Sequence, residues 1–438
     1  MESRSPLRAI LDVRLEERPF AALMFSYFFL VITSFWILKP LKKTLFIQFY
    51  DQGGFDLLSW HMAAEDAELL AKVANMLVAV AAVTVFTWLA RRLQRQQLTF
   101  LFTAFFLASY VAYSGFIDTP GPLLVWSFYL FGDLFSTLMV ATFFAFLNDS
   151  VTPDSAKRMY GPIVGGGVVG GVFGTSALRT WIDALTISEW LWVCVGLGVL
   201  IVLVAFLAGR IVDRTPPPQA APAPEPEPGR RANAAVEGAR LVFRSPYLLA
   251  IVGIVGLYEI VSTVMDYQFS ATIRHYLDGP AIGRQFATVF AITNWVSMIV
   301  QFGFTSLVMT RFGVGAALMV LPFAALGGSL AFLALPILWV GSLLNTADNA
   351  FSYSMNQSAK EALYVPTTKD EKYKAKAFID MFVQRFAKAV AVGVSLGITA
   401  LFQDFSSKRW LSLFGAAVVA LWIVAARYAG RRFAEMGR

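Results

Sequence analysis

Residues 189–209 read EWLWVCVGLGVLIVLVAFLAG, and this stretch decides the fold class. One charged side chain, Glu189, stands at its start, and the rest of the run is almost entirely apolar. A helix of about 20 apolar residues crosses the roughly 30 Å of hydrocarbon in a bilayer. Comparable runs occur at 20–38 and 98–117, so the chain is predicted to cross a membrane several times as helices.

The composition of the whole chain supports the same class. Of its 438 residues, 57% are hydrophobic and 15% are charged, against about 45–50% and 25% in average soluble domains. These values exclude a soluble globular enzyme and a disordered chain. A porin-type barrel is excluded as well, because its strands would be about 10 residues long and would alternate in polarity.

Twelve candidate spans fall into two sets of six. Between the sets lies DRTPPPQAAPAPEPEPGRRANA (213–234), whose Pro- and Ala-rich composition predicts an extended, solvated linker. We therefore expect an all-α membrane protein with an amphipathic segment at 1–19 and two six-helix bundles at 20–212 and 235–438, the plan of a transporter with parallel halves. The expected spans are 20–38, 68–90, 98–117, 122–147, 161–180, 189–209, 247–270, 285–309, 312–332, 334–355, 376–402 and 410–428.

The distribution of cations predicts the orientation. Of the 36 Lys and Arg residues, 25 fall on the side that holds both termini and nine on the other, which places both termini in the cytoplasm. The net charge of +7 is therefore attributed to cytoplasmic loops and not to a nucleic-acid partner. The single cysteine, Cys194, excludes an intrachain disulfide, and His61 and His275 have no metal-site spacing, so no metal or cofactor is expected.

Ionisable groups inside spans are costly and mark functional sites. At the end of the first span, FWILKPLKKTLF (35–46) carries Lys39, Lys42 and Lys43 beside a proline that should bend the helix. Lysines that snorkel from a helix end would explain this pattern. A cation-lined pathway would explain it as well, since three lysines break the charge rule on the outer side.

Acids also occur deep in the spans. Asp133 lies in apolar surroundings of the fourth span, where it needs a basic partner, water or a proton. In the seventh span, Glu259 and Asp266 are seven residues apart on one helical face, and Arg274 continues that face. A pathway role is one interpretation of these residues, and interhelical structural pairs are the other.

The most charged stretch runs from 352 to 390. A solvated loop explains its first lysines, but it does not explain cations that continue into the eleventh span. The candidate site residues here are Lys374, Lys376, Asp380, Arg385 and Lys388.

The glycines of GPIVGGGVVGGVFGTS (161–176) are not a nucleotide-binding loop, because no Lys-Ser/Thr follows them. Their four-residue spacing is typical of close helix packing. No ATP hydrolysis and no enzyme activity is expected, so the energy for any transport must come from a gradient or an exchange.

The charges in the predicted pathway favour an anionic cargo. Its eight cations, three of them in the first span, outnumber its four acids, and a cation-rich cavity is hard to stabilise without anions. Trp36 lies one turn before Lys39 and could stack on a base. It could equally belong to the interfacial aromatic belt.

Several motifs resemble the ATP/ADP translocase family of plastids and intracellular bacteria. SAKEALYVPTTKDEKYKAKAFID (358–380) is similar to its Lys-Glu-x-x-Tyr-x-Pro segment leading into Lys-x-Lys-Ala-x-x-Asp. DSAKRMYGPIVGGG (154–167) and KPLKKTL (39–45) resemble two further family segments, and Asp133 matches an acid of the fourth span.

The resemblance implies a major-facilitator-like fold in a bacterial inner membrane and exchange of ATP for ADP plus phosphate. It maps transport charges onto Lys39, Asp133, Lys374 and Lys376. Lys43 departs from the family, which carries an acid there, and VMDYQ (264–268) replaces a family acid followed by Trp-Lys. Distant bacterial members need not carry ATP.

The leading hypothesis is a nucleotide antiporter that works by alternating access, with phosphates held by first-span lysines and Arg385. Its expected partners are the lipid bilayer and an anionic small molecule, without a required oligomer. A proton-coupled carrier of another organic anion, with Asp133 or Asp266 as the proton site, remains an alternative, as does a non-transporting receptor or assembly protein. The expected gating or coupling acids are Asp133, Glu259, Asp266 and Asp380.

Overall fold

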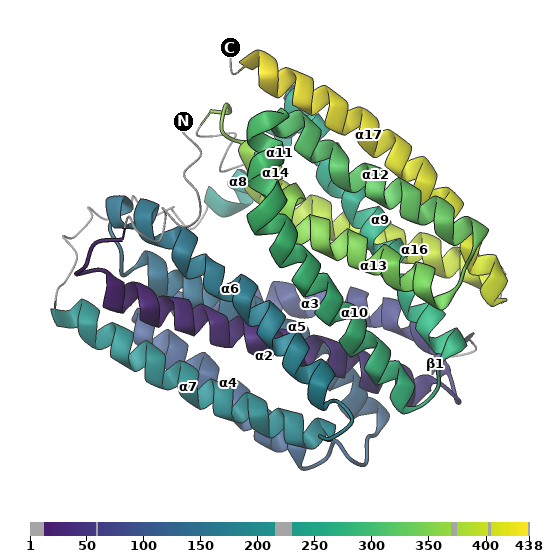
Figure 1. The fold of residues 1–438 in the computed structure, drawn as a ribbon, viewed down its shortest axis with the longest axis horizontal. Coiled ribbons are helices and arrows are strands. Elements are labelled where there is room, and N and C mark those ends of the chain that lie inside the picture. The colour runs from purple at the N-terminus through teal and green to yellow at the C-terminus, as the bar shows by residue number, and fades with distance from the viewer. Residues whose placement is uncertain (1–12, 58–59, 215–229, 369–374, 402–403, 437–438) are drawn as a thin grey trace. The chain divides into compact units, whose positions relative to one another are not determined.

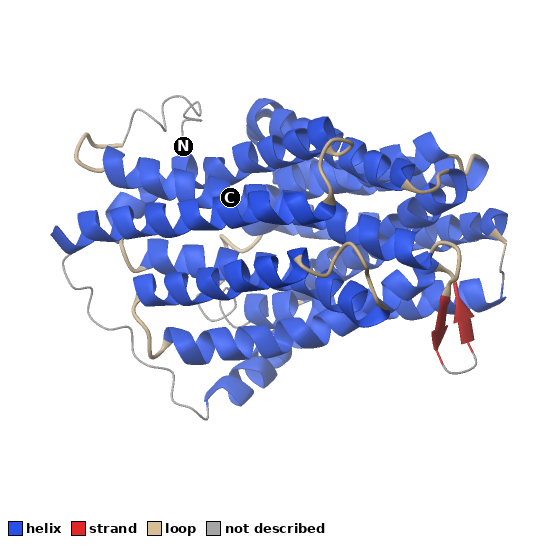
Figure 2. Cartoon of the chain, turned by 90° about the horizontal axis from the view of Figure 1, so that it is seen from below, coloured by secondary structure: helices blue, strands red, loops and turns tan. Residues whose placement is uncertain are grey.

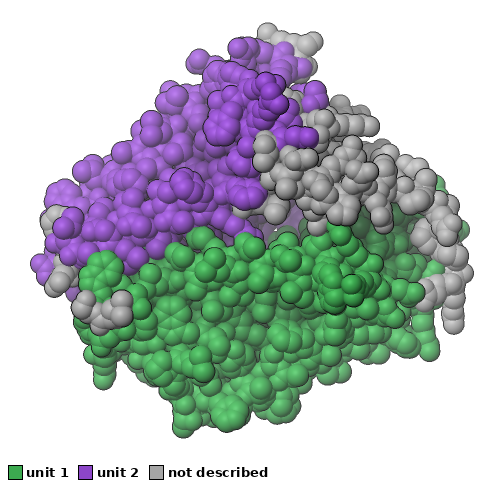
Figure 3. Space-filling model, turned by 180° about the vertical axis from the view of Figure 1, so that it is seen from behind, with its two compact units in different colours: residues 1–223, 278–294 green, residues 224–277, 295–438 purple. Residues whose placement is uncertain are grey.

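The computed structural model describes residues 13–57, 60–214, 230–368, 375–401 and 404–436. Within these ranges the chain is helical apart from one short hairpin (Figures 1 and 2). Its contacts divide it into two units (Figure 3). Unit 1 comprises residues 1–223 and 278–294, and unit 2 comprises residues 224–277 and 295–438.

Unit 1 is built around its first long helix, which packs against α5, α6 and α7. The hairpin strands pair antiparallel, with Asp56 opposite His61. The first part of α10, up to residue 294, also belongs to this unit. Its elements are α2 (Arg18–Tyr50), β1 (Phe55–Leu57), β2 (Trp60–Met62), α3 (Ala64–Ala90), α4 (Arg95–Ser114), α5 (Pro122–Asn148), α6 (Pro153–Trp181), α7 (Ile187–Arg214) and α10 (Pro280–Ile299).

The glycines of α6 let its backbone approach that of α2. A Cβ on Gly170 would lie 2.5 Å from the carbonyl oxygen of Phe29, and one on Gly174 would lie 2.7 Å from that of Thr33. The Thr33 hydroxyl in turn donates to the Gly170 carbonyl at 3.2 Å. The prediction that this run serves close packing is confirmed, since no side chain fits between the helices.

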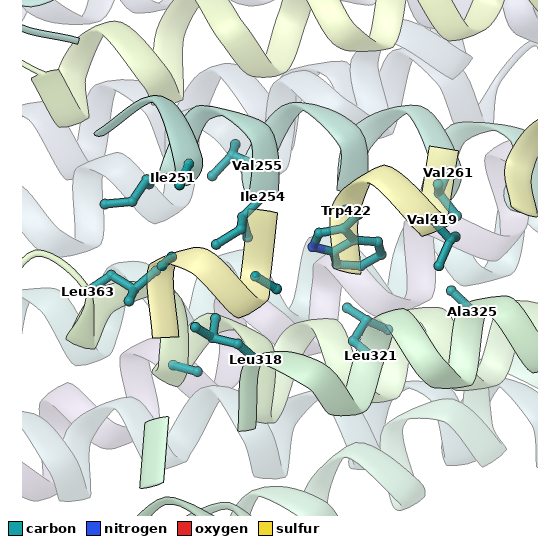
Figure 4. Packing of buried hydrophobic residues seen from close by; sticks show 14 of the residues in the cluster. Ile251, Ile254, Val255, Val261, Leu318, Leu321, Ala325, Leu363, Val419 and Trp422 are labelled. Atoms are coloured by element: carbon teal, nitrogen blue, oxygen red, sulfur yellow. The ribbon is translucent and has the colours of Figure 1, made fainter. Parts of the chain in front are cut away.

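Unit 2 packs α9, α12 and α17 around a buried core. Figure 4 shows Trp422 of α17 between Ile254 of α9 and Leu321 of α12. Within the described residues, π-helical turns interrupt its helices at η1, η2 and η4. Its elements are α8 (Arg230–Arg244), α9 (Pro246–Tyr276), η1 (Val300–Thr305), α11 (Ser306–Arg311), α12 (Gly313–Ala334), α13 (Leu338–Phe351), η2 (Ser352–Asn356), α14 (Gln357–Ala362), α15 (Lys376–Phe378), η4 (Ile379–Val383), α16 (Gln384–Leu401), η5 (Phe405–Arg409) and α17 (Trp410–Met436).

Ten of the twelve predicted spans coincide with helices that are long and apolar enough to cross a membrane. The other two, 334–355 and 376–402, correspond to α13 with 14 residues and α16 with 18 residues. Both continue from or into π-helical turns and carry polar side chains such as Asp348 and Arg385. Each is therefore a helix with a polar, interrupted end instead of one continuous apolar span.

The segments outside the bundles are described in part. Residues 1–12 of the predicted amphipathic segment lie outside the described residues, and α2 begins at Arg18. At the two ends of the predicted linker 213–234, α7 extends to Arg214 and α8 begins at Arg230. Residues 215–229 lie outside the described residues.

Candidate functional site

The lysines predicted in the first span lie on α2 within unit 1. Pro40 lies inside this helix without interrupting it. Lys42 and Lys43 are buried, and Lys39 is half-buried. Buried ammonium groups are stable only with oxygen or aromatic partners around them, and those partners define the site.

Lys42 forms an ion pair with Asp133 of α5, the acid predicted in the fourth span. The Nζ–Oδ1 distance is 2.5 Å, and the Asn75 amide of α3 donates to the other carboxylate oxygen at 2.7 Å. A Cβ on Gly132 would lie 2.7 Å from Cδ of Lys42. The glycine therefore leaves room for the lysine stem to run past α5 to the neighbouring aspartate.

Lys43 pairs with Glu68 of α3 at 3.2 Å. The Tyr129 hydroxyl donates to the same Glu68 oxygen at 3.0 Å, and Lys72 lies 4.0 Å from it. The Tyr129 ring also lies under the Lys42 ammonium, 4.4 Å from ring centroid to Nζ. Tyr129 thus joins both ion pairs, and we call these charged groups with Tyr129 the lysine cluster. Its members are Lys42, Lys43, Lys72, Glu68, Asp133 and Tyr129.

Lys39 lies against aromatic rings. Its ammonium is 4.6 Å from the Trp36 ring and 5.1 Å from the Phe290 ring of α10. Trp36 itself is buried, packed against Phe290 and close to Gly171 of α6. In this conformation the ring is neither an open stacking surface for a base nor part of an exposed aromatic belt.

In unit 2, polar side chains of α9 meet those of α13 and η2 along a row of contacts. Hydroxyl and amide groups are the donors in these contacts, which recur about once per turn of α9. We call this row the polar ladder. Its contacts are Tyr258–Ser352 at 2.6 Å, Ser262–Asp348 at 2.6 Å and Asn345–Asp266 at 3.3 Å.

Glu259, one residue from the ladder, pairs with Lys388 of α16 at 3.8 Å. The charges of both residues act on Tyr353, which follows the ladder in η2. Arg385 is half-buried one turn before Lys388, and Arg274 lies in the last turn of α9. The structure therefore brings Glu259 and Lys388 together, whereas Arg274 lies two turns beyond Asp266 along the helix.

The segment around α14 and α15 forms a third group. Lys376 pairs with Glu361 at 2.5 Å and lies 5.5 Å from the Tyr364 ring. Asp380 lies within electrostatic reach of Lys376. Lys374, also predicted here, lies outside the described residues.

A polar contact between α2 and α6 lies just outside the apolar part of the helices. Glu17 accepts hydrogen bonds from Arg158 at 2.5 Å and from Ser155 at 2.8 Å. The hydrogen bond from Arg158 lowers the pKa of Glu17 to about 2. The carboxylate is therefore charged at every physiological pH.

The sequence reasoning missed several residues that complete the site. Glu68 stands at the start of a predicted span, where an acid is ordinary, although its i,i+4 spacing to Lys72 is a usable signal. Asp348 lies inside the predicted span 334–355 and could have been found by the same rule as Asp133. With Glu68, Asp348 and Glu361 included, the excess of cations over acids is smaller than the predicted eight to four.

Comparison with known proteins places this chain in a family. A family model described as Major Facilitator Superfamily matches residues 23–363. The chain belongs to the Major Facilitator Superfamily. A second model, described as TLC ATP/ADP transporter, matches residues 333–433 of this superfamily member.

Curated relatives of this superfamily member are nucleotide carriers. The chain is 23% identical over 343 residues to the chloroplastic ADP,ATP carrier protein 1 of Arabidopsis thaliana, which covers 70% of this chain and 54% of that protein. It is 22% identical over 468 residues to the plastidic ATP/ADP-transporter of Solanum tuberosum, covering 94% and 72%. The chain thus spans about half the length of the Arabidopsis relative. The predicted resemblance to this carrier group is confirmed.

Solved structures support the fold. The crystal structure of the nucleoside transporter NupG matches with a TM-score of 0.60 at 11% identity, over 95% of this chain and 99% of that one. At this identity the likeness concerns the fold alone. The predicted major-facilitator-like, all-α membrane architecture is confirmed.

Proposed function

We propose that this protein is a secondary active transporter that exchanges nucleotides of the ATP/ADP type, or a related phosphorylated anion, by alternating access. The observation that carries the proposal is the lysine cluster, in which Lys42 and Lys43 are held as charged groups inside a helical bundle. Ammonium groups bind phosphate oxygens through strong charge-assisted hydrogen bonds. The relatives named as ADP,ATP carriers support the nucleotide as cargo.

The remaining predicted site residues take roles in this proposal. Phosphate groups would be drawn to the cations, and the acids of unit 2 would form pairs that change between conformations. Trp36 would contribute only after a rearrangement that uncovers its ring. The proposed substrate-binding residues are Lys39, Lys42, Lys43, Trp36, Asp133, Arg274, Lys374, Lys376, Arg385 and Lys388, and the proposed coupling acids are Asp133, Glu259, Asp266 and Asp380.

The proposal extends to the setting of the protein. The protein would lie in an inner membrane, and the cation asymmetry of the loops supports both termini in the cytoplasm. The partners are the bilayer and an anionic small molecule, without nucleic acid, and each chain works without a required oligomer. Exchange, not hydrolysis, supplies the energy, because the glycines of α6 pack against α2 and lack the Lys-Ser/Thr of a phosphate-binding loop.

Counter-exchange in proteoliposomes tests this function. Vesicles loaded with unlabelled ADP should take up labelled ATP, whereas empty vesicles should take up little. Lys39→Ala should lower uptake strongly, and Arg432→Ala, which breaks an exposed pair with Glu435, should not. The proposal fails if neither nucleotide moves and Lys39→Ala binds nucleotide as the parent does. Uptake driven by a pH step without counter-substrate would favour a proton-coupled carrier instead.

A further inference from the structure

The two ion pairs of the lysine cluster differ in how their carboxylates are exposed. Lys42 and Lys43 are both 4% exposed. Glu68, the partner of Lys43, is 1% exposed, whereas Asp133, the partner of Lys42, is 27% exposed. A ligand can therefore approach the Lys42 ammonium from the side of Asp133, while the Lys43–Glu68 pair is sealed.

We propose that Asp133 is an internal competitor for phosphate at Lys42. Its carboxylate occupies the ammonium in the unloaded protein and leaves it when a phosphate group of the cargo binds there. This inference rests on the proposed function and assigns the part of the site that receives the phosphate.

The chemistry of the two anions supports the exchange. Carboxylate and phosphate oxygens bind an ammonium in the same way, through short charge-assisted hydrogen bonds. A phosphate monoester carries about −1.5 to −2 charges near neutral pH, against −1 for Asp133. The stronger Coulomb attraction of the phosphate can therefore displace a carboxylate that already lies at 2.5 Å from Nζ.

The groups around the pair suit displacement of the carboxylate and not of the lysine. Asn75 donates to Oδ2 of Asp133, so the carboxylate keeps a hydrogen-bond donor after Lys42 is taken by phosphate. The Lys42 stem fits against Gly132, and its ammonium rests over the Tyr129 ring. Lys42 stays in place, and Asp133 has a second partner to hold it.

Glu68 has the opposite environment. It is contacted by Lys43, by the Tyr129 hydroxyl and, at a longer distance, by Lys72. Two close donors and a third cation at 4.0 Å surround one buried carboxylate oxygen, which makes Glu68 a fixed counter-ion. The exchangeable carboxylate of the lysine cluster is thus Asp133.

Ligand-induced thermal stabilisation of the purified, full-length protein tests the inference, because a bound anion raises the unfolding temperature by mass action. The probes are ATP and inorganic pyrophosphate, with adenosine as the probe that lacks phosphate. In Asp133→Asn, the half-maximal concentrations of ATP and of pyrophosphate should fall about tenfold. This factor corresponds to about 1.4 kcal/mol of binding free energy. Adenosine should show no such change, and Glu17→Gln, which breaks an ion pair elsewhere in unit 1, should leave all midpoints unchanged.

Asn75→Leu is the second variant, and its expected effect has the opposite sign. In this variant Asp133 has no amide donor to hold it after it leaves Lys42. Displacement therefore becomes less favourable, and the half-maximal pyrophosphate concentration should rise several-fold. If the Lys42–Asp133 pair has only a structural role, both variants should lower the unfolding temperature. The half-maximal ligand concentrations should then stay unchanged or move in the same direction in both variants, and that result would overturn the inference. If Asp133→Asn does not fold, an unchanged midpoint in Asn75→Leu overturns it. If wild-type protein gives no saturable stabilisation with ATP or pyrophosphate, the proposed function itself falls.

Discussion

The lysine cluster of unit 1 and the polar ladder of unit 2 are both partly buried groups of polar side chains, yet they are built from different bonds. In the lysine cluster, Lys43 and Glu68 are full charges that face each other at 3.2 Å with almost no exposure. In the ladder, Ser262 and Asn345 bring neutral donors to the acids of α9 and α13.

This difference predicts how each region responds to the loss of one group. Removing one partner of a buried ion pair leaves a charge in a medium that cannot solvate it, which costs about 3–5 kcal/mol. Removing one neutral donor costs about 1–3 kcal/mol. Loss of one charged group in the lysine cluster should therefore lower the free energy of unfolding more than loss of one neutral donor in the ladder.

The largest expected effect is in the lysine cluster. Glu68→Gln should lower the free energy of unfolding by about 3–5 kcal/mol, because Lys43 is left buried without its carboxylate. Glu259→Gln in unit 2 is the matched control, and its effect should stay within about 1 kcal/mol, since Lys388 is 41% exposed and screened. Equal losses in reversible unfolding experiments in detergent would remove the contrast between the regions.

The second effect concerns the helix packing that supports the lysine cluster. Gly170→Ala should destabilise the protein by about 1–3 kcal/mol, because its Cβ would lie 2.5 Å from the Phe29 carbonyl oxygen on α2. Gly165→Ala, on the same helix, has no atom within 4 Å of the new Cβ and should change stability by at most about 0.5 kcal/mol. Thermal unfolding of both variants measures the difference, and a tolerant Gly170 would show that α2 and α6 can separate freely.

A smaller effect is expected in the ladder. Ser262→Ala removes the donor at 2.6 Å from Asp348 and should cost about 1–2 kcal/mol. Ser26→Ala removes a hydroxyl that bonds only its own helix at Ala22, at an exposed position, and should stay within about 0.5 kcal/mol. A loss above 3 kcal/mol for Ser262→Ala would place the ladder in the same class as the lysine cluster.

A further expected effect is a pH dependence outside both regions. The pKa of Glu17 is lowered from its ordinary value of 4.5 to about 2 by the hydrogen bond from Arg158, so the contact stabilises the folded state above pH 4.5. This contribution should shrink as the pH falls from 4.5 toward 2, where the folded-state carboxylate becomes protonated. The difference in unfolding temperature between wild type and Glu17→Gln should accordingly narrow over that range, and a constant difference would contradict the assignment.

The sequence predicts the class, the positions of most spans and the separate importance of Lys42 and Asp133. It does not predict that these two residues pair, because the rotation of each helix about its axis depends on which faces pack. Here the glycines of α6 bring it against α2 and help to fix how α2 is turned, and Gly132 opens the path to Asp133. Glycine spacing signals close packing, but it does not say which helix will be the partner.

The polar end of the eleventh span shows a second limit. The i,i+4 spacing of Lys376 and Asp380 would allow a local pair, yet Lys376 pairs with Glu361 and Lys388 with Glu259. The π-helical turn η4 lies between these lysines and adds a residue to the helical repeat. Such a turn shifts the phase of every side chain after it, so regular spacing no longer identifies the residues that share a face.

The close pairing within the lysine cluster also has an electrical consequence. A single charge that crosses the membrane potential exchanges about 2.3 kcal/mol per 100 mV with the field. Lys42 with Asp133, and Lys43 with Glu68, are each formally neutral and would move as dipoles instead of as free charges. The voltage across the bilayer therefore does almost no net work on these two pairs, so neither pair contributes a current of its own to a transport cycle.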